Sequence, residues 1–173
     1  MSIAGGRRGQ VGSFVLLVAA VLLILRPWED GGRPGAAPRS ATAFVTRVVD
    51  GDTIAARIGE RVEDVRYIGV DTPETVEPGA PVQCFGPQAS TFNHRLVEQR
   101  RVRLVFGVER RDAYGRLLAY VHLGRRFVNA SLVRRGLART LTIPPNDRFA
   151  PLLRRLELRA ARVGRGLWGA CSP

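Results

Sequence analysis

Acidic and arginine side chains are concentrated in three short segments of this 173-residue chain. The first is DGDT at residues 50–53, and the third is DAYGR at residues 112–116. The second begins with Arg66 and continues into DTPE at residues 71–74. Each segment lies at the end of a predicted β-strand, and strand ends that are distant in sequence can meet at the mouth of a small barrel. We therefore expect the three segments to share one site.

The side chains of these segments suit the hydrolysis of a phosphodiester bond. Asp52 and Asp71, together with a main-chain carbonyl, offer the hard oxygen ligands that Ca²⁺, Mg²⁺ or Mn²⁺ prefer. Arg66 and Arg116 can bind phosphate oxygens and stabilise the negative charge that develops when water attacks phosphorus. Glu74 can accept or orient the proton of that water. Each segment alone could be an ordinary turn or a surface feature, so the prediction rests on their combination.

The charge balance of the chain favours a polyanionic partner. The chain has 27 Arg, no Lys and 15 acidic residues, which gives a net charge of +12. Residues 41–173 keep most of this excess, with 22 Arg against 13 acidic residues. Such a field attracts phosphate polymers or anionic membranes, although abundant arginine can also reflect solubility alone. The absence of lysine excludes a lysine nucleophile or Schiff base, and two cysteines are too few for a zinc ribbon.

The predicted elements favour an α+β fold, a small closed barrel of five strands with three helical caps. Short β-branched and apolar runs predict strands at 44–49, 53–58, 65–70, 102–106 and 117–123. Apolar residues at helical spacing predict helices at 87–98, 129–135 and 149–163. Pro87 suits the first turn of the first helix, and Asn129 is the expected N-cap of the second.

The N-terminal region has the composition of an export signal. Arg7 and Arg8 precede an uncharged apolar run at residues 11–25, which predicts that the N-terminus stays inside and the rest is exported. We expect an uncleaved signal anchor that contacts the membrane through residues 11–28. A cleaved signal peptide is the alternative.

The chain is therefore expected to have three parts. Residues 1–25 are the signal segment, the Gly- and Pro-rich residues 26–42 are a linker, and residues 43–173 are the folded domain. This organisation predicts a domain outside the cytoplasm, either anchored to the membrane by its N-terminus or secreted.

The two cysteines are candidates for a disulfide bond. Cys84 precedes the first predicted helix, and Cys171 lies near the C-terminus. Because exported domains meet an oxidising environment, we expect the two cysteines to be bonded, and two free thiols are the alternative.

Five motifs of the predicted domain occur in a recognisable order. They are VDGDTI at 49–54, RYIGVDTPET at 66–75, FGPQAS at 85–90, DAYGRLLAY at 112–120 and VNASLVRRGLA at 128–138. From about residue 43 to residue 168, their order and spacing resemble the staphylococcal nuclease (thermonuclease) family. The resemblance implies an OB-fold barrel of five strands with three helices, which agrees with the elements predicted above.

The resemblance implies a metal site within the first two segments. Asp52, Asp71 and the main-chain carbonyl of Thr72 correspond to the ligands of one Ca²⁺ ion, while the ligand types alone would also accept Mg²⁺ or Mn²⁺. Asp50 corresponds to an acidic residue that shapes the same pocket.

The resemblance also implies the catalytic residues and the substrate. Arg66 and Arg116 correspond to the two phosphate-binding arginines, and Glu74 corresponds to the general base, with Asp112 and Tyr114 as supporting residues. Members of this family hydrolyse DNA and RNA and leave 3′-phosphate ends. We expect a monomer that prefers single-stranded substrates.

Two departures from the family pattern bear on substrate affinity, and the missing aromatic residues together with the membrane tether favour a second hypothesis. The type member has two tyrosines that pack against the bound nucleotide, but residues 140–147 (TLTIPPND) contain no aromatic residue. Ala113 replaces a lysine beside the Tyr-Gly-Arg motif. The alternative function is a non-catalytic OB-fold module that binds nucleic acid at the membrane.

Overall fold

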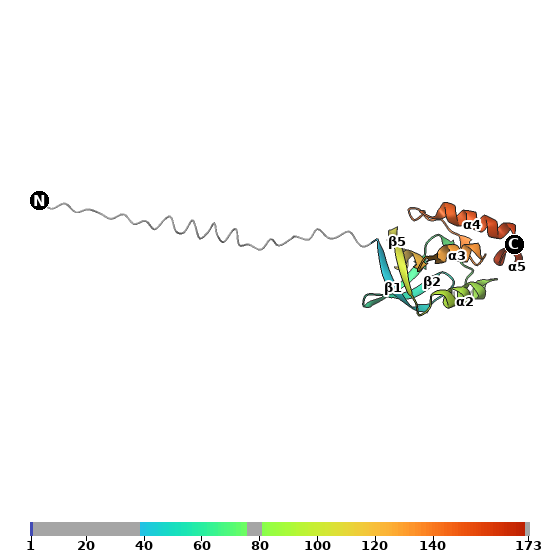
Figure 1. Cartoon of the computed structure of the whole chain (residues 1–173), viewed down its shortest axis with the longest axis horizontal. Helices are drawn as coiled ribbons and strands as arrows, with labels where there is room; N and C mark the ends of the chain where they lie inside the picture. Colours follow the sequence, from blue (N-terminus) through green and yellow to red (C-terminus); the bar gives the residue numbers. More distant parts are fainter. Residues whose placement is uncertain (2–38, 76–80, 172–173) are drawn as a thin grey trace. The chain divides into compact units, whose positions relative to one another are not determined.

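The computed structural model of the chain describes Met1 and residues 39–75 and 81–171. Within these residues five strands form a closed barrel in the order β3-β2-β1-β5-β6, and a parallel pairing of β3 with β6 closes it (Figure 1). The barrel strands are β1 (Ser40–Val48), β2 (Thr53–Ile58), β3 (Arg61–Tyr67), β5 (Arg101–Arg111) and β6 (Leu117–Leu123). The two-residue strands are β4 (Val70–Asp71), β7 (Arg126–Phe127) and β8 (Arg139–Thr140).

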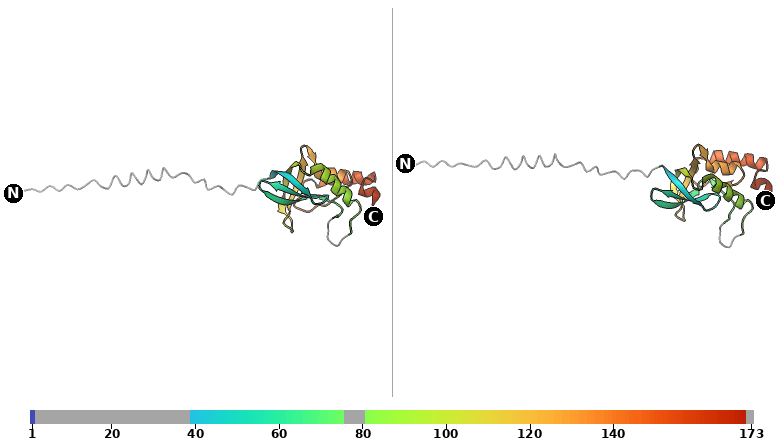
Figure 2. Two further views of the ribbon diagram at one scale, coloured as in Figure 1. Left: turned by 90° about the horizontal axis from the view of Figure 1, so that it is seen from below. Right: turned by 60° about the horizontal axis from the view of Figure 1, so that its bottom comes forward.

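The helices of the described residues pack around this barrel. They are α2 (Gly86–Val97), α3 (Val128–Arg134), α4 (Ala150–Arg162) and the short α5 (Leu167–Ala170). Figure 2 shows α4 and α5 together at the end of the domain that lies away from β1 and β2. Alternate strand residues, such as Ala43 and Val45 of β1 and Val102 and Leu104 of β5, are buried in the core. This alternation places the intervening side chains on the outer face of the barrel.

The predicted α+β barrel with five strands and three helices is confirmed. The strand expected at 65–70 is divided in two, because Gly69 adopts a φ of 80° and the chain turns between β3 and β4. The sequence pattern predicts none of β4, β7, β8 and α5, because elements of two to four residues are too short to show a period.

The prediction that Asn129 caps the second predicted helix is wrong. Helix α3 begins at Val128, and no side chain hydrogen-bonds to its N-terminus. Asn129 is instead fully buried, where its Oδ1 accepts a hydrogen bond from the Val121 N–H at 2.9 Å and its Nδ2 donates to the Ile68 carbonyl at 2.8 Å. The side chain therefore joins α3 to β6 and to the turn after β3, a tertiary role that a local capping rule does not predict.

Apart from Met1, the predicted signal segment, residues 1–25, lies outside the described residues, and so does nearly all of the predicted linker, residues 26–42. In the described ranges, 39–75 and 81–171, there is no helix of the length and hydrophobicity that crossing a membrane requires. Strand β1 already begins at Ser40, where it pairs with Val105 of β5, three residues before the expected start of the domain.

The expected disulfide between Cys84 and Cys171 is present. It joins the segment before α2 to the residue that follows α5, across a sequence separation of 87. Gln83, beside the bonded cysteine, donates its backbone N–H to the Glu74 carbonyl at 2.9 Å and accepts the Glu74 N–H through Oε1 at 3.0 Å. The bond therefore ties the C-terminal end of the domain to the segment that holds Glu74.

Removal of this bond is expected to destabilise the domain. The chain-entropy model gives an upper value of about 4–5 kcal/mol for a loop of this length. Urea denaturation of a Cys84→Ser/Cys171→Ser variant should therefore show a clearly lower free energy of unfolding than the oxidised wild type. A reducing agent should lower the midpoint of the wild type and leave that of the variant unchanged. Identical midpoints for the variant and the oxidised wild type would contradict the expectation.

A buried carboxylate on α4 anchors the β4–β8 pair. Glu157 is only 4% exposed, and it accepts hydrogen bonds from the Thr140 N–H at 2.8 Å and the Thr140 hydroxyl at 2.7 Å. Arg154 forms an ion pair with the same carboxylate. Thr140 lies opposite Val70 of β4, next to the predicted metal ligand Asp71. Glu157 therefore connects α4, through β8, to the strand that carries Asp71.

The Glu157→Gln variant is expected to lose about 1–2 kcal/mol of unfolding free energy at neutral pH. Burial opposes ionisation of Glu157, but the hydrogen bonds from Thr140 and the charge of Arg154 outweigh it and hold its pKa below the ordinary 4.5. A carboxylate with a lowered pKa stabilises the fold at pH values above its unfolded-state pKa. This contribution is lost as the pH falls through the folded-state pKa. Denaturation at a series of pH values should show that the difference in unfolding free energy between the wild type and Glu157→Gln becomes smaller below pH 4.5. A difference that is the same at every pH would contradict the role of Glu157.

Candidate active site

The β1–β2 hairpin packs tightly against the segment that follows β4. An added Cβ at Gly51 would lie 2.6 Å from Oγ1 and 2.7 Å from Cβ of Thr72, which is too close for any side chain. Glycine is therefore required here because of the close approach of two segments. The contact brings the 50–53 segment beside the 71–74 segment. These are two of the three segments that carry the predicted site residues.

Asp52 is buried at the centre of this contact. Only 3% of the residue is exposed, and its Oδ2 accepts a hydrogen bond from the Thr72 N–H at 2.7 Å. The backbone N–H of Asp52 donates to Oδ1 of Asp50 at 2.9 Å. Burial raises the pKa of Asp52 to about 7, although the nearby positive charge of Arg66 opposes the rise. Because the Asp52 carboxyl group is buried, a nearby positive charge is required to stabilise its ionised form.

Arg66 supplies one such partner and bridges two of the predicted metal ligands. Its Nη1 lies 3.0 Å from Oδ2 of Asp52, and its Nη2 lies 2.9 Å from Oδ1 of Asp71. Nη1 also donates to the carbonyls of Val70 at 2.8 Å and Tyr67 at 3.2 Å. A guanidinium has five N–H donors, so Nε and the second hydrogen of Nη2 can still bind a phosphate. The backbone and both carboxylates therefore fix the orientation of Arg66.

One polar pocket of about 180 Å³ contains all of the predicted metal and catalytic residues. It is lined by Asp50, Asp52, Arg66, Asp71, Thr72, Pro73, Glu74 and Arg116. Four carboxylates and two guanidiniums leave an excess of negative charge in a protein that is otherwise strongly basic. The structure thus brings the three segments together, as the sequence analysis predicts.

The donor set of this pocket fits a hard divalent cation. Its side chains offer oxygen atoms and no thiolate or imidazole, and the carboxylate excess matches a double positive charge. Within residues 39–75 and 81–171, no three His, Cys, Asp or Glu side chains are grouped closely enough to hold an ion by themselves. Asp52, Asp71 and the Thr72 carbonyl are the lining groups that could hold a metal here, with water or phosphate oxygens completing its coordination.

Glu74 lies at the rim of the polar pocket, where backbone contacts fix its position. Its Oε1 accepts a hydrogen bond from the Thr75 N–H at 2.8 Å. An added Cβ at Gly86, the first residue of α2, would lie 3.0 Å from the carbonyl oxygens of both Pro73 and Glu74. The start of α2 therefore packs directly against the main chain of the Glu74 segment.

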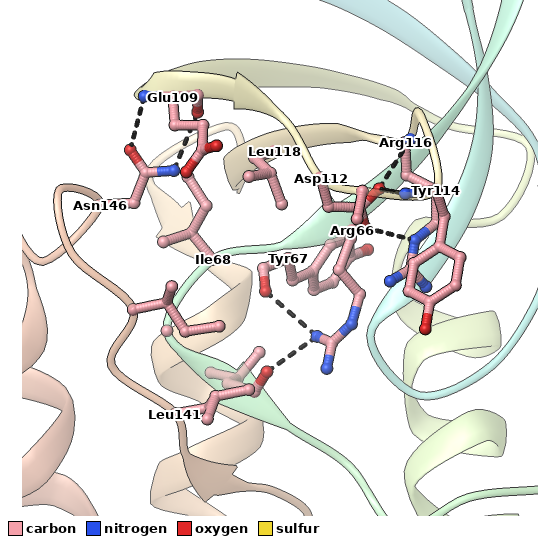
Figure 3. Close-up of a pocket in the computed structure, with 14 residues that line it drawn as sticks. Arg66, Tyr67, Ile68, Glu109, Asp112, Tyr114, Arg116, Leu118, Leu141 and Asn146 are labelled. Carbon is pink, nitrogen blue, oxygen red and sulfur yellow. Dashed lines mark hydrogen bonds and ion pairs between the residues drawn. The ribbon is translucent and has the colours of Figure 1, made fainter.

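The third segment contributes Arg116 to the polar pocket. Figure 3 shows Arg116 close to Asp112 and Tyr114 of the same segment. Arg116 donates from Nε to Oδ2 of Asp112 at 2.7 Å, and Oδ1 of Asp112 accepts the backbone N–H groups of Tyr114 and Arg116. Partial burial opposes ionisation of Asp112, but these hydrogen bonds outweigh it and lower its pKa. The Arg116 guanidinium lies 5.4 Å from the centre of the exposed Tyr114 ring. Asp112 and Tyr114 thus hold Arg116 while its terminal nitrogens remain available to a ligand.

A second, mainly apolar pocket of about 360 Å³ adjoins the polar one and shares Arg66 and Arg116 with it (Figure 3). Leu141 and Ile143 line it, and their side chains are 41% and 58% exposed. They belong to the 140–147 stretch, in which the sequence analysis noted the absence of aromatic residues. The 140–147 stretch therefore contributes aliphatic side chains to this pocket, and its aromatic lining residues are Tyr67 and Tyr114.

A buried hydrogen-bond network behind the polar pocket was missed by the sequence analysis. The Tyr67 hydroxyl donates to Oδ1 of Asn93 at 3.1 Å, and Nδ2 of Asn93 donates to the Asp50 carbonyl at 3.2 Å. Both side chains are almost completely buried. The network joins β3 and α2 to the hairpin that carries Asp50 and Asp52. A polar residue on the inner face of a predicted helix was the only signal that pointed to it.

Comparisons with known proteins agree with this site. A family model described as "Staphylococcal nuclease homologue" matches residues 64–170. The chain is 40% identical over 160 residues to a thermonuclease of Staphylococcus intermedius, which covers 91% of this chain and 95% of that protein. It is 35% identical to a thermonuclease of Staphylococcus hyicus, over 89% of this chain and 95% of that protein. It is also 37% identical to endonuclease YncB of Bacillus subtilis, over 81% of this chain and 68% of that protein.

Proposed function

Because the chain belongs to the staphylococcal nuclease family, we propose that this phosphodiester-hydrolysing nuclease depends on Ca²⁺, cuts DNA and RNA with a preference for single strands, and leaves 3′-phosphate ends. The observation that supports the proposal most is the single polar pocket that the three segments line together. The resemblance to thermonucleases supports the choice of ion and of products.

In this proposal the metal ligands and Glu74 have different roles. Asp52, Asp71 and the Thr72 carbonyl would hold Ca²⁺, which when bound supplies Lewis-acid charge beside the phosphate. Glu74 accepts the proton of the attacking water, and the Thr75 N–H holds the Glu74 carboxylate in place for this role.

The two arginines stabilise the negative charge that develops on the phosphate oxygens. Arg66 approaches from β3, already oriented by Asp52 and Asp71, and Arg116 approaches from the segment before β6. Because both guanidiniums are held before substrate binds, little reorganisation is needed as the phosphorus centre becomes five-coordinate.

A cleavage assay with the purified full-length chain tests the proposal. We expect a labelled single-stranded DNA and an RNA of the same sequence to be cut with Ca²⁺ and to remain intact when a chelator replaces it. The shorter products should change mobility after phosphatase treatment, since they carry a 3′-phosphate. A folded protein that binds the DNA with or without Ca²⁺ and never cuts it would support the binding module instead.

We also propose that the domain works outside the cytoplasm, held at the membrane by residues 11–28 or released from it. The apolar run at residues 11–25 and the Cys84–Cys171 disulfide support this location, because disulfides persist in oxidising compartments. Fractionation of cells that express the full chain should find it in the membrane or the culture medium. A chain confined to the cytoplasmic fraction would contradict the location.

A further inference from the structure

The outer face of the barrel carries an aromatic side chain between two arginines, away from the polar pocket. Phe44 of β1 lies opposite Arg57 of β2 on one side and opposite Arg101 of β5 on the other. Side chains that lie directly opposite each other in antiparallel strands share a face of the sheet. Phe44 alternates with the buried Ala43 and Val45, so this face is the outer one. We call Phe44, Arg57 and Arg101 the outer row.

The outer row has a local excess of positive charge. Arg57 and Arg101 are exposed, and within residues 39–75 and 81–171 neither forms an ion pair with an acidic side chain. Arg103 adds a further exposed guanidinium two residues along β5. Arg103 lies directly opposite His122 of β6, and burial, followed by the charge of Arg103, lowers the pKa of that histidine. The backbones of Arg57 and Arg101 lie about 10 Å apart on the two sides of β1, and two arginines without an ion-pair partner among the described residues attract anions.

The outer row also has the shape and chemistry to hold a nucleotide. A surface pocket of about 280 Å³ is lined by Thr42, Ala43, Phe44, Arg57, Gly59 and Arg101. The Arg57 guanidinium lies 5.6 Å from the centre of the Phe44 ring. Aromatic rings and guanidinium planes stack on nucleobases, and arginines bind the backbone phosphates, which is how many proteins hold single strands without sequence preference.

We propose that the outer row is a second binding site for single-stranded nucleic acid, which holds the substrate several nucleotides away from the bond that is cut. The proposal rests on the proposed nuclease function. Phe44 and Asp50 of the polar pocket are six positions apart in the chain, which corresponds to at most about 20 Å of extended backbone. At about 3.4 Å per stacked nucleotide this distance spans about six nucleotides, so a long substrate reaches both sites and a trinucleotide does not.

Binding measurements on three variants test the outer row. A labelled long single-stranded oligonucleotide is titrated with each protein in a chelator, so that no cleavage interferes. Arg57→Ala/Arg101→Ala should weaken binding about tenfold and reduce the slope of log Kd against log salt by about 1.4, since two phosphate contacts are lost. Phe44→Leu should weaken binding with little change in slope, because it removes stacking and no charge. Arg57→Lys/Arg101→Lys should recover the salt slope.

A matched control variant loses the same number of positive charges at a site far from the outer row. Arg159→Ala/Arg162→Ala changes two exposed arginines of α4, at the end of the domain away from β1 and β2 (Figure 2). Equal loss of binding in this control and in Arg57→Ala/Arg101→Ala would overturn the proposal, because it would reveal only an effect of net charge. Circular dichroism spectra of the variants should match that of the wild type, which checks that each variant is folded.

Cleavage with Ca²⁺ separates the second site from the proposed function. For Arg57→Ala/Arg101→Ala the ratio of kcat/KM on the long oligonucleotide to kcat/KM on a trinucleotide should fall about tenfold. An unchanged ratio would overturn the second site while leaving the nuclease function intact. If neither the wild type nor any variant cuts either substrate, the proposed nuclease function is wrong. The binding measurements in chelator then still show whether the outer row binds single-stranded nucleic acid. Loss of binding to anionic phospholipid vesicles with an unchanged oligonucleotide Kd would instead assign this face to the membrane.

Discussion

Replacement of Arg66 by alanine is expected to lower kcat for phosphodiester hydrolysis by about 10³-fold. Arg66 forms ion pairs with both of the carboxylates that are predicted to bind the metal, and it lines the polar pocket as well as the apolar one. Its loss removes a preoriented positive charge from the site where the phosphate becomes more negative. Steady-state kinetics on a single-stranded oligonucleotide would measure the effect.

The Arg66→Ala result needs controls for folding, because the change leaves the buried Asp52 without its ion-pair partner. Arg116→Ala keeps the Arg66 contacts and should still lose activity by a comparable factor. Arg66→Lys keeps the charge but not the paired geometry, so it should recover only part of the rate. Arg159→Ala on α4 should have wild-type kinetics. Near wild-type rates for both Arg66→Ala and Arg116→Ala would contradict their roles.

The Glu74→Gln variant is expected to lose a factor of about 10²–10⁴ in kcat. Glutamine keeps the size of the side chain and an oxygen that can accept the Thr75 N–H, but it cannot take a proton from water. A large change in kcat with a small change in KM would therefore identify a role in the chemical step. Initial rates with saturating Ca²⁺ over a range of substrate concentrations would separate the two parameters.

Glu63→Gln is the matched control for Glu74→Gln. Glu63 forms an ion pair with Arg111 on the protein surface and does not line the polar pocket. This control should retain wild-type kinetics. Equal rates for Glu74→Gln and the wild type would show that Glu74 is not the base, even if the chain cuts nucleic acid.

The sequence was sufficient to predict the barrel and the residues of the polar pocket. Alternating apolar residues defined the barrel strands, and the DGDT and DTPE segments stood at strand ends, where a small barrel brings side chains together. The DGDT segment was also compatible with an ordinary turn, and the sequence did not show that Gly51 is needed because Thr72 approaches it closely.

The features that the sequence did not predict depend on contacts between distant segments. Asn129 resembled a helix cap, yet it hydrogen-bonds to β6 and to the turn after β3. Asn93 is a polar residue on the inner face of a predicted helix, but this position does not reveal that it links Tyr67 to the Asp50 carbonyl. Glu157 lies within the predicted helix at 149–163, and only the fold shows that it anchors β8. Such roles are set by tertiary packing, which periodicity and motif spacing do not encode.

The most direct test of the central claim is a crystal structure of the full chain with Ca²⁺ and a non-hydrolysable nucleotide analogue. We expect Ca²⁺ bound by Asp52, Asp71 and the Thr72 carbonyl, with the guanidiniums of Arg66 and Arg116 both on one phosphate of the analogue. A cation bound elsewhere, or a phosphate that contacts neither arginine, would contradict the account.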